Sequence, residues 1–253
     1  MASRLARAFG AFRIAVEKLR NHYRNLREKP ERALSVGFPY PNSYETKHHE
    51  RVEFTYNSRS TTAKLVFVAT TTKGIEVLVK FTRRYSEEAH RLCAEAGVAP
   101  GLLGFQSLPA GWYMVVMEYL DPQNYRVLKP GDGSNHRLVA EIRRVVTVLH
   151  SGDFVHGDIR DVNMMVRHQW GTEEKTEEKT EEKTEEKTEE KARNVLLLDF
   201  DWAGPKNVTK YPPHLNLQTV KRHEGAKDGA LIMPEHDLFM AEVMFDTVVT
   251  TFV

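Results

Sequence analysis

Residues 154–166 read FVHGDIRDVNMMV, and residues 195–203 read VLLLDFDWA. In the first stretch Asp158 stands five residues before Asn163, so one tight turn can aim both side chains into the same space. In the second, Asp199 follows a run of four apolar residues, and burial of that run would hold the carboxylate rigidly. Aspartate and asparagine offer the hard oxygen ligands that Mg²⁺ prefers. The two stretches together predict one polar site built from distant parts of the chain.

Two charged residues upstream complete a set suited to phosphoryl transfer. Lys80 ends an apolar run, and Glu88 lies on the short helix expected after it. Transfer from a nucleotide needs a cation on the phosphates and a carboxylate that holds this cation. It also needs an aspartate that orients the attacking hydroxyl, and oxygen ligands for Mg²⁺. Lys80, Glu88, Asp158 and the pair of Asn163 and Asp199 can supply these functions in that order.

These motifs resemble the protein-kinase-like superfamily. HGDIRDVN at 156–163 resembles the catalytic loop, DFD at 199–201 the Asp-Phe-Gly position, and VVMEYL at 115–120 the hinge. The details are similar to the divergent protein kinases expanded in fungi. The HGD triplet is also similar to that of aminoglycoside phosphotransferases and choline kinases. The resemblance covers about residues 52–240.

The resemblance implies an ATP- and Mg²⁺-dependent kinase that acts on a hydroxyl of a protein or of a small molecule. Arg160, two residues after the catalytic-loop aspartate, could contact the transferred phosphate bidentately. Glu87 is the alternative to Glu88 as partner of the lysine. Gly157 replaces the loop arginine, so we expect no dependence on a phosphorylated activation loop. The implied site residues are catalytic Asp158, Lys80 and Arg160, nucleotide-binding Lys80, Glu88, Met117, Glu118, Leu120 and Met165, and magnesium-binding Asn163 and Asp199.

The pattern of apolar residues predicts an α+β fold with two lobes. Short β-rich runs at 52–56, 65–70, 76–81, 102–106 and 112–119, with a helix at 86–96, predict a small antiparallel β lobe over residues 51–120. The apolar stripe of Leu138, Ile142, Val145 and Leu149 predicts a helix that ends near Gly152. It begins a reduced helical lobe over residues 121–253.

Two further segments lie outside this core. Residues 1–30 carry an apolar stripe at helical spacing, which predicts an amphipathic helix that packs on the main body. A basic targeting peptide and a surface-binding helix are the alternatives. Residues 172–191 read TEEK five times and hold no apolar residue, so we expect a disordered, tolerated insertion.

Several positions depart from the kinase pattern. The phosphate-loop position, NSRSTTAK at 57–64, has no glycine. Leu78 replaces a small alanine and could narrow the adenine slot, and Asp201 replaces the glycine of Asp-Phe-Gly. Only 16 residues follow Asp237, where protein substrates usually dock on further helices. These departures leave a small-molecule phosphotransferase and a non-catalytic pseudokinase module open as alternatives.

Composition excludes some other classes. No apolar run approaches the roughly 18 residues of a membrane span. The net charge of +1 gives no argument for nucleic-acid binding. A single cysteine, Cys93, cannot form an intramolecular disulfide, so we expect a reducing compartment. The cytoplasm is the first expectation, with the nucleus possible and mitochondrial import a weaker alternative.

Overall fold

The computed structural model describes residues 2–27, 40–60, 64–168 and 193–245 and divides into two units. The first, Met1–Asn42, contains helix α1 (Ala2–Arg27), within the segment 1–30 where the sequence predicts an amphipathic helix. Phe9 and Phe12 on its apolar stripe are exposed. The packing of this stripe on the main body stays a prediction. The expected insertion at 172–191 lies outside the described residues, as does Pro30, the expected end of the helix.

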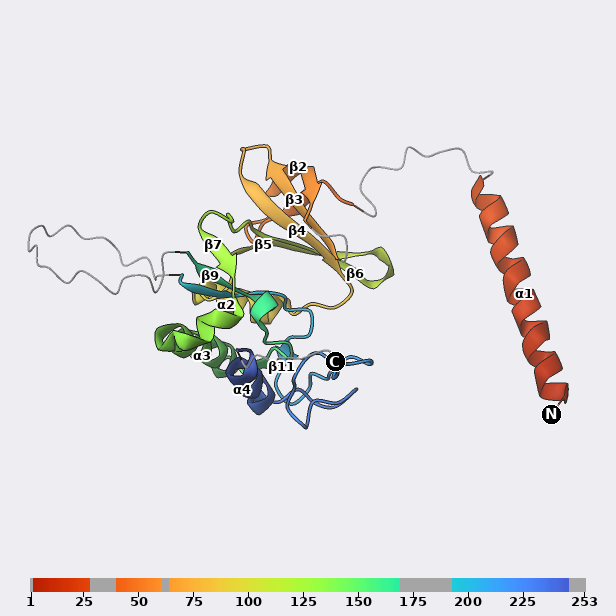
Figure 1. The fold of residues 1–253 in the computed structure, drawn as a ribbon. Coiled ribbons are helices and arrows are strands. Elements are labelled where there is room, and N and C mark those ends of the chain that lie inside the picture. The colour runs from red at the N-terminus through yellow and green to blue at the C-terminus, as the bar shows by residue number, and fades with distance from the viewer. Residues whose placement is uncertain (1, 28–39, 61–63, 169–192, 246–253) are drawn as a thin grey trace, which may run out of the picture. The chain divides into compact units, whose positions relative to one another are not determined.

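The second unit, Ser43–Val253, begins with a six-stranded antiparallel sheet of order β1-β2-β3-β4-β6-β5. Figure 1 shows this sheet above the helices of the same unit. All five β-rich runs read from the sequence are strands in it, and only the short β1 was not expected. The strands are β1 (Ser43–Glu45), β2 (Arg51–Arg59), β3 (Leu65–Thr71), β4 (Glu76–Thr82), β5 (Leu102–Leu108) and β6 (Trp112–Glu118).

Helices α3 and α4 form the second lobe with β7 to β11. Helix α2, expected in the β lobe, packs into the core of this second lobe through Ala89 and Cys93. Helix α2 (Glu87–Glu95) begins at Ser86, whose hydroxyl accepts from the Ala89 amide at 3.3 Å, and α3 (His136–Ser151) begins at the cap Asn135. Helix α4 (Pro234–Val243) contains Asp237, which in the sequence resembles the aspartate that anchors a helix of the kinase-like helical lobe. The short elements are η1 (Pro109–Gly111), β7 (Tyr125–Val127), η2 (Pro130–Ser134), β8 (Phe154–Val155), η3 (Asp161–Asn163), β9 (Met164–Arg167), β10 (Val195–Leu197) and β11 (Gly204–Pro205).

Two apolar cores explain why the lobes hold together. In the sheet, Phe54, Val77, Val79 and Met114 are buried, together with the aromatic rings beside them. In the helical lobe the predicted stripe of α3 is fully buried against α2, β9, β10 and α4. At about 25 cal/mol per Å² of apolar surface, such burial is the main stabilising term. Among the described helices, none has the length and apolar character needed to cross a lipid bilayer.

Candidate active site

One buried aspartate, Asp237, fixes the backbone of the predicted catalytic loop. Asp237, on α4, accepts hydrogen bonds from the backbone amides of His156 and Gly157, both at 2.7 Å, and from Nε2 of His150 at 3.0 Å. Its side chain is completely buried. A buried carboxylate with three donors holds two consecutive amides in place, which fixes the direction in which Asp158 leaves the loop.

Gly157 is required by this geometry. Its φ is +78°, which disfavours residues with a side chain, and a Cβ at this position would stand 2.5 Å from Cδ1 of Ile232. An arginine at this position would therefore need both a left-handed backbone and a shift of the Ile232 side chain.

The Asp158 carboxylate is held by three side chains. Oδ1 accepts from Nη2 of Arg222 at 2.7 Å, and Oδ2 accepts from Nη2 of Arg160 at 2.8 Å and from Nδ2 of Asn163 at 2.9 Å. The Arg222 side chain is only 3% exposed, donates to the Gly157 carbonyl at 3.0 Å and lies 5.0 Å from the centre of the Trp202 ring. Asp158 and Asn163 thus lie together as predicted. The three side chains that hold the carboxylate, Arg160, Asn163 and Arg222, are called the Asp158 cage below, and the motif gave no sign of Arg222.

Lys80 and Asp199 also meet. Lys80 contacts Asp199 directly and lies 2.6 Å from Asp201, and its side chain is almost completely buried. Nζ of Lys64, from the segment before β3, lies 2.5 Å from the second oxygen of Asp199. The Asp199 carboxylate is therefore held between two ammonium groups.

The charges of this cluster set the protonation of its two aspartates. Burial alone would raise the pKa of Asp199, but the ammonium groups of Lys80 and Lys64 lower it well below its usual range, so the carboxylate is ionised. Burial and the neighbouring charge of Asp199 raise the pKa of Asp201 to about 6, against the opposing effect of Lys80. Asp199 has a left-handed backbone with φ +64°, a strained conformation that concentrates at functional sites.

The structure corrects the expected ion-pair partner of Lys80. Glu88 is exposed, and Glu87 instead pairs with Arg91 at 2.6 Å along α2. Among the described residues, the ion pairs of Lys80 involve Asp199 and Asp201 and no glutamate. The physical reason is that Asp201, absent from the usual Asp-Phe-Gly pattern, supplies the second carboxylate. The expected ion pair between Glu88 and Lys80 is therefore not formed in this structure.

Phe200 links α2 to the catalytic loop through a stack of rings. The His90 ring stacks on it at 4.7 Å, and the His156 ring meets its edge at 5.5 Å. Burial lowers the pKa of His90 to about 4, so this ring is neutral at ordinary pH, and it bonds to the Pro100 carbonyl at 2.9 Å. This stack positions Asp199, which directly precedes Phe200.

The backbone also joins the two predicted magnesium ligands. The amide of Leu198, next to Asp199, donates to the Asn163 carbonyl at 2.8 Å, and Nε2 of His156 donates to the Leu198 carbonyl at 3.1 Å. Asn163 uses only its Nδ2 for Asp158, so its Oδ1 is the atom suited to a cation. No described group of three or more His, Cys, Asp or Glu side chains could hold a metal alone. The donor set fits Mg²⁺, which commonly uses one or two protein ligands and completes its shell with water and phosphate oxygens.

The predicted nucleotide-binding residues lie at the end of β6 and on β9. Met117 pairs in register with Leu78 of β4, the residue expected to narrow the slot, and with Leu102 of β5. Glu118 is tied to Arg193 at 2.7 Å and to the Gly101 amide at 2.9 Å; these contacts lower its pKa although burial alone would raise it. Leu120 is buried and Met165 half-buried. Adenine contact at these residues stays a prediction.

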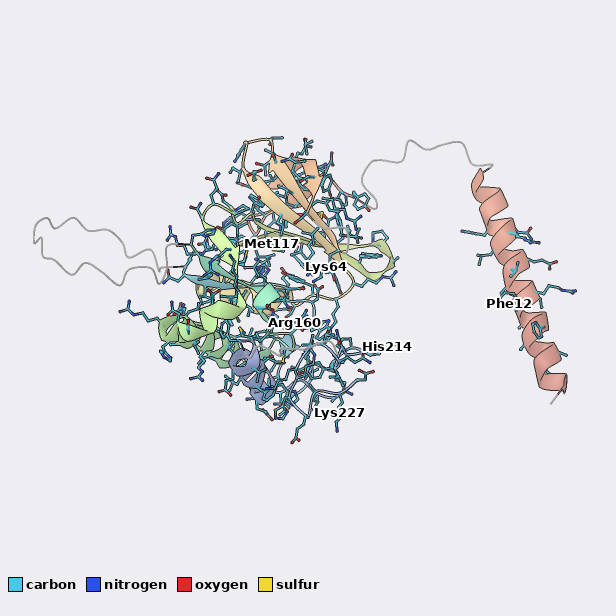
Figure 2. The ribbon with its side chains drawn as sticks, viewed as in Figure 1. Phe12, Lys64, Met117, Arg160, His214 and Lys227 are labelled. Carbon is cyan, nitrogen blue, oxygen red and sulfur yellow. The ribbon has the colours of Figure 1, made fainter. Side chains whose placement is uncertain are left out.

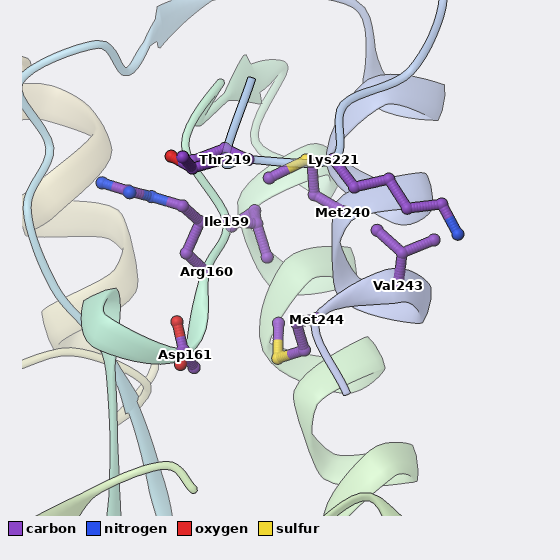
Figure 3. Close-up of a pocket in the computed structure, with 9 residues that line it drawn as sticks. Ile159, Arg160, Asp161, Thr219, Lys221, Met240, Val243 and Met244 are labelled. Atoms are coloured by element: carbon purple, nitrogen blue, oxygen red, sulfur yellow. The ribbon is translucent and has the colours of Figure 1, made fainter. Parts of the chain in front are cut away.

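A pocket of about 430 Å³ lies beside the catalytic loop (Figure 3). The loop contributes residues 159–161, and the chain segment 219–221 contributes a second wall. Helix α4 contributes Met240 and Val243, and Met244 follows directly after it. The volume falls in the range of small-ligand sites. Because Arg160 belongs to both the pocket wall and the Asp158 cage, the pocket adjoins the predicted acceptor position.

Two residues that contact the predicted site aspartates were missed in the sequence. Lys64 contacts Asp199 across 135 positions of the chain, and Arg222 contacts Asp158 across 64. For Lys64 a signal existed, since it ends the glycine-free segment where phosphate contacts are expected. For Arg222 no local pattern distinguishes it from its neighbour Lys221.

Comparisons with known proteins agree on the fold. The chain is similar to vaccinia related kinase 3, with a TM-score of 0.51 and 12% identity over 83% of this chain and 68% of the other. It is also similar to the kinase PK-1 of Cydia pomonella granulovirus, with a TM-score of 0.51 and 10% identity over 79% and 69%. No family model and no curated protein sequence matches. The fold is thus the bilobal protein-kinase-like fold that the sequence predicted.

Proposed function

We propose that this chain is an ATP- and Mg²⁺-dependent kinase, of the divergent fungal protein-kinase type, that transfers a phosphoryl group to a hydroxyl. The observation that carries the proposal is the meeting of Lys80, Asp199, Asn163 and Asp158, from three distant segments, in one cluster on a kinase-like fold. Serine or threonine of a protein is the preferred acceptor.

Each side chain has a defined task in this proposal. Lys80 binds the phosphates of the nucleotide, while Asp199 and Oδ1 of Asn163 hold the magnesium ion. The ion supplies charge neutralisation at the phosphates and orients them for in-line attack. Asp158 orients the acceptor hydroxyl and takes its proton. As the new phosphorus–oxygen bond forms, the bond to the leaving nucleoside diphosphate breaks.

The hydrogen bonds of the Asp158 cage limit how an acceptor hydroxyl can reach the carboxylate. Oδ2 already accepts from Arg160 and Asn163, whereas Oδ1 accepts from Arg222 alone. An acceptor hydroxyl therefore either uses the remaining lone pair of Oδ1 or takes the place of a guanidinium group. The Arg160 side chain is 31% exposed against 3% for Arg222, so Arg160 is the group free to exchange. On release it can neutralise the transferred phosphoryl group.

The test is turnover of Mg-ATP with a mixed set of hydroxyl acceptors. Asp158→Asn keeps the shape of the side chain and removes the base, so the rate is expected to fall by about 10²–10⁴. Asp228→Asn, on an exposed turn, is the matched control and keeps the wild-type rate. A wild-type rate no higher than that of Asp158→Asn would reject the proposal. Peptide pools run beside amino alcohols and aminoglycosides separate a protein kinase from a small-molecule phosphotransferase.

A second candidate is a non-catalytic module of the same fold. The observation that favours it is that Asp158, Asp199 and Asp201 all have cationic partners within the protein, so the site is internally neutralised. Melting temperatures measured with and without Mg-ATP test whether the nucleotide binds. A folded protein whose melting temperature does not change would favour this candidate.

A further inference from the structure

Residues 57–64 stand at the sequence position of a phosphate-binding loop but contain no glycine. The described part of this segment is held by its own contacts: Nε and Nη2 of Arg59 both donate to the Lys64 carbonyl at 3.2 Å, and the Ser60 amide donates to the Val66 carbonyl at 2.8 Å. The backbone of Lys64 is therefore fixed by the same guanidinium that closes the turn.

The side chain of Lys64 reaches the nucleotide site from this position. Figure 2 shows Lys64 on the side of the sheet that faces the helical lobe. Its ammonium lies 2.5 Å from Oδ2 of Asp199, and its side chain is 52% exposed, against 8% for Lys80. The two lysines thus approach the same carboxylate, one from the interior and one from the solvent-facing side.

Binding of a divalent ion changes the partners of these lysines. When the oxygens of Asp199 coordinate the ion, the ammonium groups of Lys64 and Lys80 both lose an anionic partner. An ammonium in a partly buried site needs a new anion, and the phosphates of the nucleotide are the anions that enter with the ion. Lys80 lies deep in the site, so Lys64 is placed to contact phosphates nearer the entrance.

We propose that Lys64 is a phosphate-binding residue, whose side-chain charge replaces the backbone amides that a glycine-rich loop would provide. This inference rests on the proposed function. An amide nest holds phosphate through its shape, whereas a lysine acts as a point charge. The contribution of Lys64 therefore grows with the number of phosphates and weakens at high salt.

The experiment measures binding of ATP, ADP and adenosine, with Mg²⁺, to the full chain by isothermal titration. Lys64→Met is expected to weaken ATP binding about tenfold or more, since a charge-assisted hydrogen bond is lost, and to leave adenosine binding unchanged. Lys64→Arg restores most of the ATP affinity. Lys73→Met, at an exposed turn between β3 and β4, is the matched control and binds ATP as the wild type does.

The outcomes separate the inference from the function on which it rests. ATP binding by Lys64→Met equal to that of the wild type, or an equal loss for ATP and adenosine, would overturn the role of Lys64 while the proposed function stands. A wild-type chain that binds neither ATP nor ADP would overturn both. The effect of Lys64→Met should also shrink between low and high salt; a constant ratio would contradict a charge-based contact.

Discussion

Replacement of Arg222 by glutamine tests whether the Asp158 cage is a real energetic unit. The guanidinium is almost fully buried, donates to Asp158 at 2.7 Å and to the Gly157 carbonyl at 3.0 Å, and stacks near Trp202. Breaking a buried ion pair costs about 3–5 kcal/mol. Because Arg160 still holds the carboxylate, we expect the low end, about 3 kcal/mol. For a unit of this size that is a fall in melting temperature of about 6–12 °C.

The assay is a double-mutant cycle by urea unfolding. Arg222→Gln, Asp158→Asn and the double variant are compared with the wild type, and the coupling energy between the two sites is expected to be about 1.5–3 kcal/mol. Arg83→Gln is the control, because Arg83 is exposed and stacks on Trp112 at 5.1 Å without a buried carboxylate. A coupling energy below about 0.5 kcal/mol, with Arg222→Gln no more harmful than Arg83→Gln, would refute the reasoning.

Two other perturbations follow from buried groups of the same lobe. The pKa of His90 is lowered from 6.5 to about 4, so the unfolded chain takes up a proton that the folded chain refuses, and stability falls as the pH drops through this window. The cost of His90→Gln should therefore be about 2 kcal/mol smaller at pH 5 than at pH 8 in urea titrations, and equal costs would contradict the assignment. Asp237→Asn replaces one of the two carboxylate oxygens that accept from His156, Gly157 and His150 by an NH₂ group, which cannot accept. The free energy of unfolding should therefore fall by about 2–4 kcal/mol. A loss below about 1 kcal/mol would show that these hydrogen bonds to Asp237 are dispensable for stability.

The parts of the fold that the sequence predicted are those with local causes. The periodicity of the apolar stripe along α3 and of the β-rich runs of the sheet can be read directly from the sequence. Each element is found within a few residues of its expected bounds. Strands of two or three residues, such as β8 and β11, show no period that can be read, so they were missed. Helix α4 shows no apolar stripe, because its buried face includes His236 and Asp237, so it was indicated only by the resemblance of Asp237 to a helix-anchoring aspartate.

The site divides in the same way. Asp158 and Asn163 lie within one turn of the chain, and their contact follows from the spacing of five. The partner of Lys80 did not follow, because the motif pointed to a glutamate on α2 while the fold presents His90 on that face and offers Asp201 instead. Which cation meets which carboxylate depends on tertiary distances, and a residue pattern contains no such distances.

The cluster as a whole contains four cations, Lys64, Lys80, Arg160 and Arg222, around three carboxylates, and the raised pKa of Asp201 makes its charge the easiest to lose. Such a site favours an anion, and any anion that binds must compensate for the internal ion pairs it disrupts. A nucleoside triphosphate with its metal ion meets that condition whether or not chemistry follows. Nucleotide binding would therefore support both an enzyme and a binding module, because both need the lysines. Only turnover that depends on Asp158 distinguishes the enzyme from the binding module. Orienting a hydroxyl requires a free lone pair on this carboxylate, either the one that Arg222 leaves on Oδ1 or one that Arg160 releases on Oδ2.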